Sequence, residues 1–220
     1  MYFGFHHCGG SIISKNYVLT AAHCIESINS NSLSVRSGSP YSDTGGMVHK
    51  VLKTIAHKNY RSTDDLIDND IGLIKVHEPF EYDSSTKRIN IVKKWYKLKP
   101  GIICTISGWG VTESTGDPEV LMATYVPIAN KTLCSEAYKK KGGVSETEFC
   151  AGYYGKKEKD ACIGDSGGPL IIDGKQAGII SRGYDFCDDD RYPGVYVDVS
   201  MYYDWIIENA HLETNYLSNH

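Results

Sequence analysis

Short apolar segments alternate along most of the chain with turns rich in glycine, serine and aspartate. Examples rich in Val, Ile and Tyr are residues 11–22, 33–36, 48–56, 71–76, 102–107, 169–172 and 176–181. Many short strands separated by turns are typical of a β-barrel or a β-sandwich. The pattern therefore predicts a mostly β protein and leaves the choice between these two architectures open.

A helical pattern is limited to two places. One is residues 132–139, which follow Asn130 as a candidate helix cap, and the other is the C-terminal segment 202–210. An asparagine side chain accepts hydrogen bonds from the first free N–H groups of a helix, so Asn130 favours a helix start. All apolar runs are too short for a membrane span, and we expect no membrane partner.

The composition is that of a globular protein with a large core. The 220 residues are 41% hydrophobic and 23% charged, and they include 22 glycines. A formal net charge of -4 gives no electrostatic reason to expect nucleic acid or an anionic membrane surface as a partner. Composition therefore argues against these partner classes.

Residues 159–170 contain the sequence Gly-Asp-Ser-Gly-Gly-Pro, in which the serine is Ser166. At average residue usage such a hexapeptide arises by chance about once in ten million windows, so an ordinary glycine turn is a poor explanation. Glycines beside a serine let bare backbone approach a reacting carbonyl. A serine hydroxyl is a weak nucleophile at neutral pH, and Ser166 therefore needs a base and a group that orients the base.

Two residues can supply these roles. His23 follows an apolar run and a short Ala-rich turn, and Asp70 leads into another apolar run. Each alone fits a structural histidine or a solvated acid better. In the order His23, Asp70, Ser166, with their flanking motifs, they closely resemble the trypsin/chymotrypsin family of serine endopeptidases. Subtilisin-like enzymes and hydrolases with a nucleophile elbow have other orders.

The resemblance extends over nearly the whole chain, from residues 7–11 through 107–110 and 193–196 to the final helix. It implies an all-β fold of two packed antiparallel β-barrels with a C-terminal helix, and with the first N-terminal strand region missing. It also implies a single domain over 1–220. The N-terminal barrel is expected at about 1–85, a crossover at about 86–100, and the C-terminal barrel and helix at about 101–220.

The resemblance assigns the catalytic roles. Ser166 attacks the scissile carbonyl, His23 takes and returns the proton, and Asp70 stabilises the imidazolium. The backbone N–H groups of Gly164 and Ser166 stabilise the oxyanion. No cofactor and no metal is implied.

The substrate pocket follows from the same resemblance. Asp160 lies at its floor, Gly183 and Gly194 form its walls, and Ser181 binds substrate backbone beside Asp70. A carboxylate in a narrow apolar slot attracts a lysine or arginine and leaves an uncharged occupant with an unsatisfied buried charge. We therefore expect cleavage after Lys or Arg, with protein or peptide substrates and proteinaceous protease inhibitors as partners, and a monomer.

The seven cysteines contain no Cys-x-x-Cys pair, which favours disulfides over a zinc site. The resemblance pairs Cys8 with Cys24, Cys134 with Cys150, and Cys162 with Cys187, and it leaves Cys104 as a buried thiol. Disulfides indicate an oxidising compartment, and Asn130-Lys131-Thr132 is a candidate glycosylation sequence. We therefore expect an extracellular, secreted protein.

Two positions near the pocket depart from the family pattern. Arg182 stands before Gly183, where the family usually has tryptophan. Its charge could favour acidic residues upstream of the cleavage site, repel basic residues, or fold back onto Asp160 or Asp185. Ile163 stands where a polar residue is common and is expected to make the pocket entrance more apolar.

The start of the chain, residues 1–6, departs most. It has neither the basic end and long apolar core of a secretory signal nor the Ile-Val-Gly-Gly-like activation sequence of zymogens in the family. In relatives, the amine freed by proteolysis pairs with the acid beside the nucleophile, here Asp165. Without that amine, Asp165 would be buried without a partner, at a cost of several kcal/mol, or its loop would take a zymogen-like arrangement, and either outcome could leave the chain as given inactive.

Two functions remain open from the sequence. One is an active endopeptidase, and the alternative is a catalytically silent serine protease homologue that acts as a binding protein. Silent homologues usually lose a triad member, whereas this chain keeps all three, which favours the enzyme. Residues 55–60 and 68–75 further resemble arthropod digestive trypsins, among them mite trypsins of the group 3 allergens.

Overall fold

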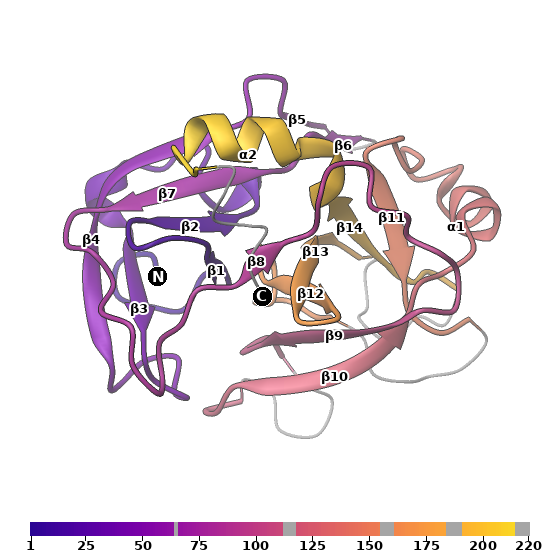
Figure 1. The fold of residues 1–220 in the computed structure, drawn as a ribbon. Helices are drawn as coiled ribbons and strands as arrows, with labels where there is room; N and C mark the ends of the chain where they lie inside the picture. The colour runs from indigo at the N-terminus through magenta and orange to yellow at the C-terminus, as the bar shows by residue number, and fades with distance from the viewer. Residues whose placement is uncertain (64–65, 112–117, 155–160, 184–190, 214–220) are drawn as a thin grey trace.

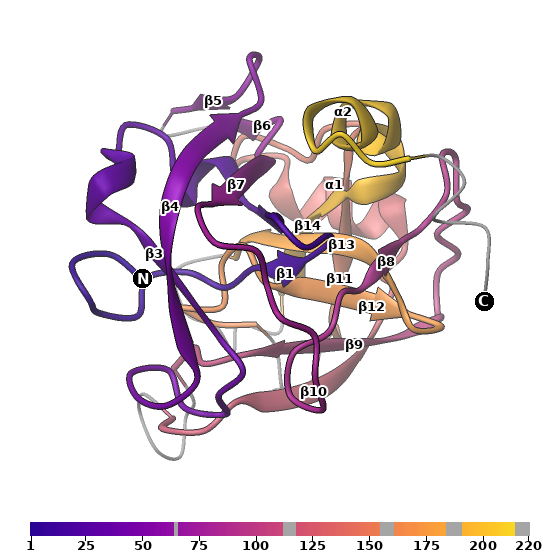
Figure 2. The same ribbon diagram turned by 60° about the vertical axis from the view of Figure 1, so that its left-hand side comes forward.

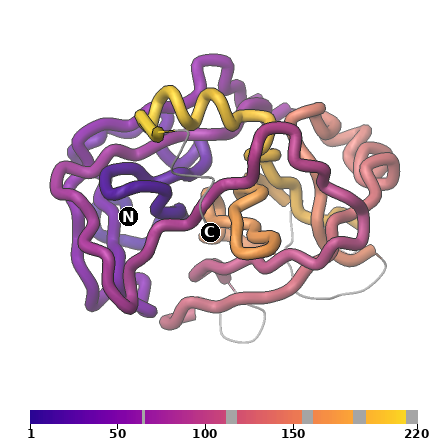
Figure 3. The backbone as a smooth tube through the Cα atoms, in the orientation of Figure 1, coloured from indigo at the N-terminus to yellow at the C-terminus, as the bar shows by residue number. Residues whose placement is uncertain are grey.

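Two curled antiparallel sheets, each a half-barrel, dominate the computed structural model (Figure 1). The structure describes residues 1–63, 66–111, 118–154, 161–183 and 191–213. Figure 3 shows that the chain builds the first sheet, crosses over once after residue 76, and then builds the second sheet. The fold is therefore mostly β, as the sequence predicts.

The first sheet has five strands in the order β1-β2-β7-β4-β3. The strands are β1 Ser11–Ile12, β2 Tyr17–Thr20, β3 Ser34–Ser37, β4 Met47–Ala56 and β7 Gly72–Val76, and β5 Arg61–Ser62 pairs separately with β6 Ile67–Asp68. The segment 11–22, one apolar segment in the sequence pattern, is two strands with a turn between them. Ser14 Oγ stabilises the turn by accepting hydrogen bonds from the N–H groups of Asn16 and Tyr17, at 3.3 and 3.1 Å.

The second sheet has seven strands, six of them in the order β10-β9-β12-β13-β14-β11, with β8 beside β13. They are β8 Asn90–Ile91, β9 Ile103–Gly108, β10 Met122–Pro127, β11 Glu148–Ala151, β12 Pro169–Ile172, β13 Lys175–Arg182 and β14 Gly194–Asp198. One buried cluster contains residues of both sheets, including Leu19, Leu73, Leu170 and Ile179. The two sheets therefore share a core that fixes their relative position.

Both predicted helices are present. α1, Lys131–Tyr138, begins after Asn130, whose Oδ1 accepts from the N–H groups of Thr132 and Leu133 at 2.9 and 3.2 Å. α2, Tyr203–Asn209, follows a 3-10 turn at Val199–Tyr202. The C-terminal helix lies over the first sheet (Figures 1 and 2), where the ring of Trp205 is 5.3 Å from that of His57. No helix in the described ranges is long and apolar enough to span a bilayer.

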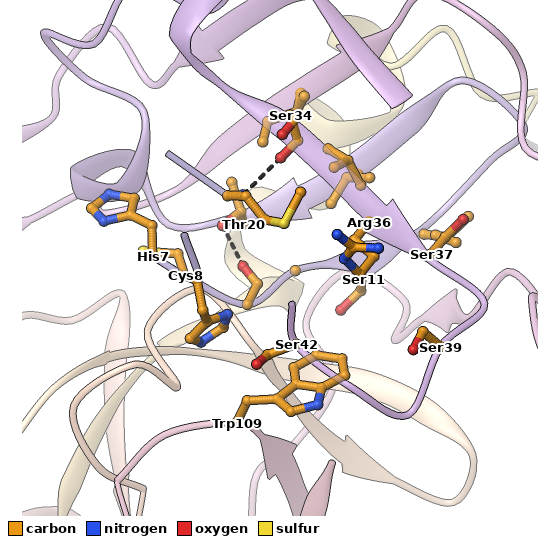
Figure 4. Close-up of a pocket in the computed structure, with 18 of the residues that line it drawn as sticks. His7, Cys8, Ser11, Thr20, Ser34, Arg36, Ser37, Ser39, Ser42 and Trp109 are labelled. Carbon is orange, nitrogen blue, oxygen red and sulfur yellow. Dashed lines mark hydrogen bonds between the residues drawn. The ribbon is translucent and has the colours of Figure 1, made fainter. Parts of the chain in front are cut away.

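A cavity of about 370 Å³ lies between β1 and β3, the strands at the two ends of the first sheet (Figure 4). Ser11, Ile12 and Val35 are among its lining residues. The amino group of Met1 donates a hydrogen bond to the carbonyl of Ser34 at 2.7 Å, and the N–H of Ser34 donates to the Met1 carbonyl at 3.0 Å. Met1 therefore lies alongside β3 at the edge of this cavity.

Candidate active site

His23 and Asp70 are held together at the end of β2. His23 lies in the 3-10 turn Ala22–Cys24, and its side chain is 28% exposed. Its Nδ1 is 2.7 Å from Asp70 Oδ2, and its backbone N–H donates to Asp70 Oδ1 at 2.9 Å. Because an ionised carboxylate only accepts, Nδ1 carries the proton of the neutral ring. Nε2 is therefore left with a lone pair that can accept a proton.

The Asp70 carboxylate is fully buried, with a side-chain exposure of 0%. The hydroxyl of Ser181, from β13 of the second sheet, donates to its Oδ2 at 2.7 Å. Burial alone would raise the pKa of Asp70, but the hydrogen bonds from His23 and Ser181 and the charge of His23 outweigh it and lower the pKa. Asp70 is therefore a buried anion at neutral pH, placed to stabilise a positive charge on the imidazole.

The residue before Asp70 anchors the backbone next to it. Asn69 has a φ of 54°, a left-handed conformation that asparagine tolerates better than most residues. Its side chain donates to the Asn59 carbonyl at 3.2 Å and accepts from the Tyr202 hydroxyl at 2.9 Å. The pairing of Asn69 with Tyr202 cannot be predicted from the sequence, because no local pattern links two polar side chains so far apart.

Asp70 is expected to make stability depend on pH in acid. Its folded pKa lies below the value of about 3.9 for an unfolded chain, so its contribution is present above that pH and is lost as the pH falls further. We expect Asp70→Asn to flatten the fall of the unfolding free energy between about pH 4 and pH 2. Urea unfolding across this pH range measures the free energy of unfolding of each variant, and substitution of the exposed Asp173 (Asp173→Asn) is the control. Equal slopes for Asp70→Asn and the wild type would contradict the assignment.

The loop that carries Ser166 lies against the turn that carries His23. The N–H of Gly9 donates to the Ser166 carbonyl at 2.8 Å, and Cys24 Sγ is 3.7 Å from that carbonyl oxygen. Gly167 has a φ of 80°, and a Cβ there would lie 2.2 Å from the side-chain oxygen of Thr20. The motif glycine thus lets the loop of the second sheet approach β2. The fold therefore brings the segments of His23, Asp70 and Ser166 to one place.

Asp165 has partners, which corrects the expectation of an unpaired acid. Its Oδ1 accepts from the N–H of Gly110 at 2.8 Å, and its Oδ2 accepts from the N–H of Cys162 at 3.0 Å. A Cβ at Gly108 would lie 1.9 Å from Asp165 Oδ1, and one at Gly110 would lie 2.5 Å from the carboxylate. The glycines of the Ser-Gly-Trp-Gly motif therefore make the space that this carboxylate occupies.

Gly164, the expected oxyanion residue, also adopts a backbone conformation that favours glycine. Its φ is 98°, and its carbonyl accepts a hydrogen bond from His6 Nε2 at 2.8 Å. His6 therefore ties the segment before β1 to the serine loop.

The expected pocket residues lie at the ends of β13 and β14. Ser181 is the penultimate residue of β13, Gly183 follows that strand and is exposed, and Gly194 begins β14 and is buried. Asp160, the expected floor, and Asp185 lie outside the described residues. Ile163 is 73% exposed, as suits a residue at an entrance.

Arg182 is not a free charge, contrary to one expectation from the sequence. Its guanidinium is bound to the carboxylate of Glu148, and its Nη2 also donates to the Gly143 carbonyl at 2.7 Å. The side chain is only 13% exposed, and its guanidinium carbon lies 5.9 Å from the centre of the Tyr138 ring. The first residue of β11 therefore neutralises it, an arrangement that sequence spacing could not reveal.

Two of the expected disulfides are formed, Cys8–Cys24 and Cys134–Cys150. Cys187, in the third expected pair, lies outside the described residues. Cys104 is a free, buried thiol as predicted, and burial raises its pKa to about 12. Cys8, His23 and Cys24 are close enough for a shared metal ion, but the disulfide removes both thiolates.

A histidine oriented by a buried carboxylate, next to a serine loop supplied by the other of two β half-barrels, is the arrangement on which two-barrel serine peptidases depend for nucleophilic catalysis. Comparisons with known proteins lead from this class to a family.

The family model described as Trypsin matches residues 1–206. Trypsin epsilon of Drosophila erecta is 39% identical over 213 residues, which cover 94% of this chain and 79% of that protein. Trypsin of Phaedon cochleariae is 37% identical over 210 residues, covering 94% and 80%. The chain belongs to the trypsin family and is a serine-type endopeptidase. These relatives do not confirm the finer resemblance to mite trypsins.

The fold agrees with a solved structure of the same kind. Neuropsin, a serine protease expressed in the limbic system of mouse brain, superposes with a TM-score of 0.82 at 33% identity. The match covers 92% of this chain and 88% of neuropsin. The two half-barrels are therefore those of a trypsin-like protease.

Proposed function

We propose that this protease hydrolyses peptide bonds after Lys or Arg, with Ser166 as nucleophile, His23 as base and Asp70 as the group that orients it. The observation that carries the proposal is the 2.7 Å bond between His23 Nδ1 and the buried Asp70 carboxylate. It fixes the tautomer in which Nε2 can accept the serine proton.

In this mechanism, Ser166 Oγ attacks the scissile carbonyl carbon while its proton passes to His23 Nε2. The imidazolium is stabilised by the Asp70 anion, and it returns the proton to the leaving amine. A water molecule then attacks the acyl-enzyme with the same proton transfers. The N–H groups of Gly164 and Ser166 stabilise the oxyanion, each by roughly 3–4 kcal/mol of barrier.

The preference for Lys or Arg is proposed from the position of Asp160, six residues before Ser166. Gly183 and Gly194 have no side chains, so they would leave room for a long basic side chain to reach this carboxylate. Its partners are then proteins or peptides with exposed Lys or Arg, and inhibitor proteins that present the same residues to the cleft.

Secretion is proposed from the disulfides. Cys8–Cys24 and Cys134–Cys150 require an oxidising compartment to form and persist. The first of them also closes the loop that carries His23, so the site itself depends on that environment.

Labelling by a fluorophosphonate probe tests the proposal. We expect covalent modification of Ser166, identified by mass spectrometry, and loss of labelling after heat unfolding, because only the oriented histidine activates this serine. Peptides that differ only in Lys, Arg or Gln before the scissile bond measure the preference. A folded protein that takes no label would instead be a silent homologue with a binding role.

A further inference from the structure

Arg182 and Glu148 form a nearly buried ion pair beside the site. The carboxylate of Glu148 accepts from both terminal nitrogens of the guanidinium, with the longer contact at 3.3 Å. The side chains are 13% and 2% exposed. Because both carboxylate oxygens face the planar guanidinium, the pair is bidentate, the geometry in which arginine binds a carboxylate most strongly.

The pair is also tied into its surroundings on both sides. Glu148 Oε2 accepts from the N–H of Ser145 at 2.9 Å, and Arg182 donates to the Gly143 carbonyl at 2.7 Å. The Tyr138 ring lies 5.9 Å from the guanidinium carbon, within the range of a cation–π contact. These contacts hold the guanidinium against α1 and the loop that follows it.

Arg182 occupies a position between two residues of the proposed site. Ser181 precedes it and bonds to Asp70, and Gly183 follows it as an exposed residue of the proposed substrate pocket. A substrate residue upstream of the scissile bond would therefore pass close to Arg182. A free guanidinium here would attract acidic side chains, whereas a paired one has little net charge to offer.

We propose that Glu148 is a positioning residue for substrate specificity: it holds Arg182 and cancels its charge, so that the protease accepts acidic and neutral residues upstream of the cleavage site alike. The proposal rests on the proposed function for the place of the substrate. Removing the Glu148 charge leaves a cation mostly out of water, which is costly, and the flexible arginine turns toward the solvent of the cleft.

The experiment uses pairs of peptides with Arg at the cleaved bond and either Glu or Gln at one of the three residues before it. For the wild type we expect the Glu and Gln peptides to differ by less than about twofold in kcat/KM. For Glu148→Gln we expect a preference of about fivefold or more for Glu in at least one peptide pair, falling toward one as salt rises from about 0.05 to 0.5 M.

Two variants separate charge from structure. Glu148→Asp keeps the carboxylate and should keep the wild-type ratio, while Glu148→Gln/Arg182→Gln removes both charges and should return the ratio to wild type. A general weakening of the fold would lower the rates of both peptides without this salt-dependent preference. An unchanged ratio in folded Glu148→Gln, or a salt-sensitive preference for Glu in the wild type, would overturn the proposal.

If Glu148→Gln does not fold, the wild type still tests the proposal, because a salt-sensitive preference for Glu in the wild type would overturn it. Binding of the product peptides, which end in Arg, gives the same Glu-to-Gln ratio as Kd values from fluorescence anisotropy. If the folded protein cleaves no peptide and takes no fluorophosphonate, the proposed function fails, and the Kd ratios of the wild type and the folded variants still decide the role of Glu148.

Discussion

Ser166→Ala is expected to lower kcat/KM for a peptide with Lys or Arg at the cleaved bond by about 10⁴- to 10⁶-fold. The alanine has no hydroxyl for His23 to deprotonate, so only the oxyanion donors and substrate binding remain. Rates with a fluorogenic peptide measure the loss, and thermal unfolding shows whether the variant is folded.

The exposed Ser62→Ala serves as the control for serine removal. It should retain wild-type activity and fluorophosphonate labelling, whereas Ser166→Ala should take no label. Retention of more than about a tenth of the activity by Ser166→Ala would exclude this serine as nucleophile.

Asp70→Asn is expected to lower kcat by about 10⁴-fold with little change in KM. An asparagine can turn its NH₂ group toward His23 Nδ1, which moves the ring proton to Nε2 and leaves that nitrogen unable to accept the serine proton. The variant also loses the anion that stabilises the imidazolium. Steady-state kinetics at pH 8 measures both effects.

The control for this change is Asp68→Asn, two residues away and partly buried against Arg61. Asp68→Asn should lower kcat far less than Asp70→Asn, because it leaves the hydrogen bond between His23 and Asp70 intact. If both variants lose activity equally, the effect would come from the local fold of this segment and not from the carboxylate that faces His23.

Much of the fold follows from local sequence, because alternating or continuous apolar runs mark the buried strands. β7 and β13 are of this kind, and both lie in the sheet centres. β10 cannot be predicted in this way, because its residues are mostly exposed at a sheet edge, where burial imposes no pattern. The turn at Ser14 has no glycine or proline to mark it in the sequence, because side-chain hydrogen bonds stabilise it.

The candidate site likewise contains residues that local sequence predicts and residues that it does not. His23, Asp70 and Ser166 stand in local motifs that can be found in the sequence. The partners of Arg182 and Asn69 cannot be found in this way, because each contact joins segments that only the folded chain brings together. Glu148 begins a strand of the second sheet, and nothing near it in sequence marks it as the partner of Arg182.

The base and its carboxylate come from the first sheet, whereas the serine loop and the hydroxyl of Ser181 come from the second. The catalytic groups therefore lie at the interface between the two sheets. A shift of one sheet relative to the other by a fraction of a bond length would separate these groups and stop catalysis, while the hydrogen bonds within each sheet stay intact. Heat or denaturant should accordingly abolish the enzymatic activity before either sheet unfolds. Enzymatic activity is therefore a more sensitive measure of the relative position of the two sheets than any spectroscopic signal from the strands.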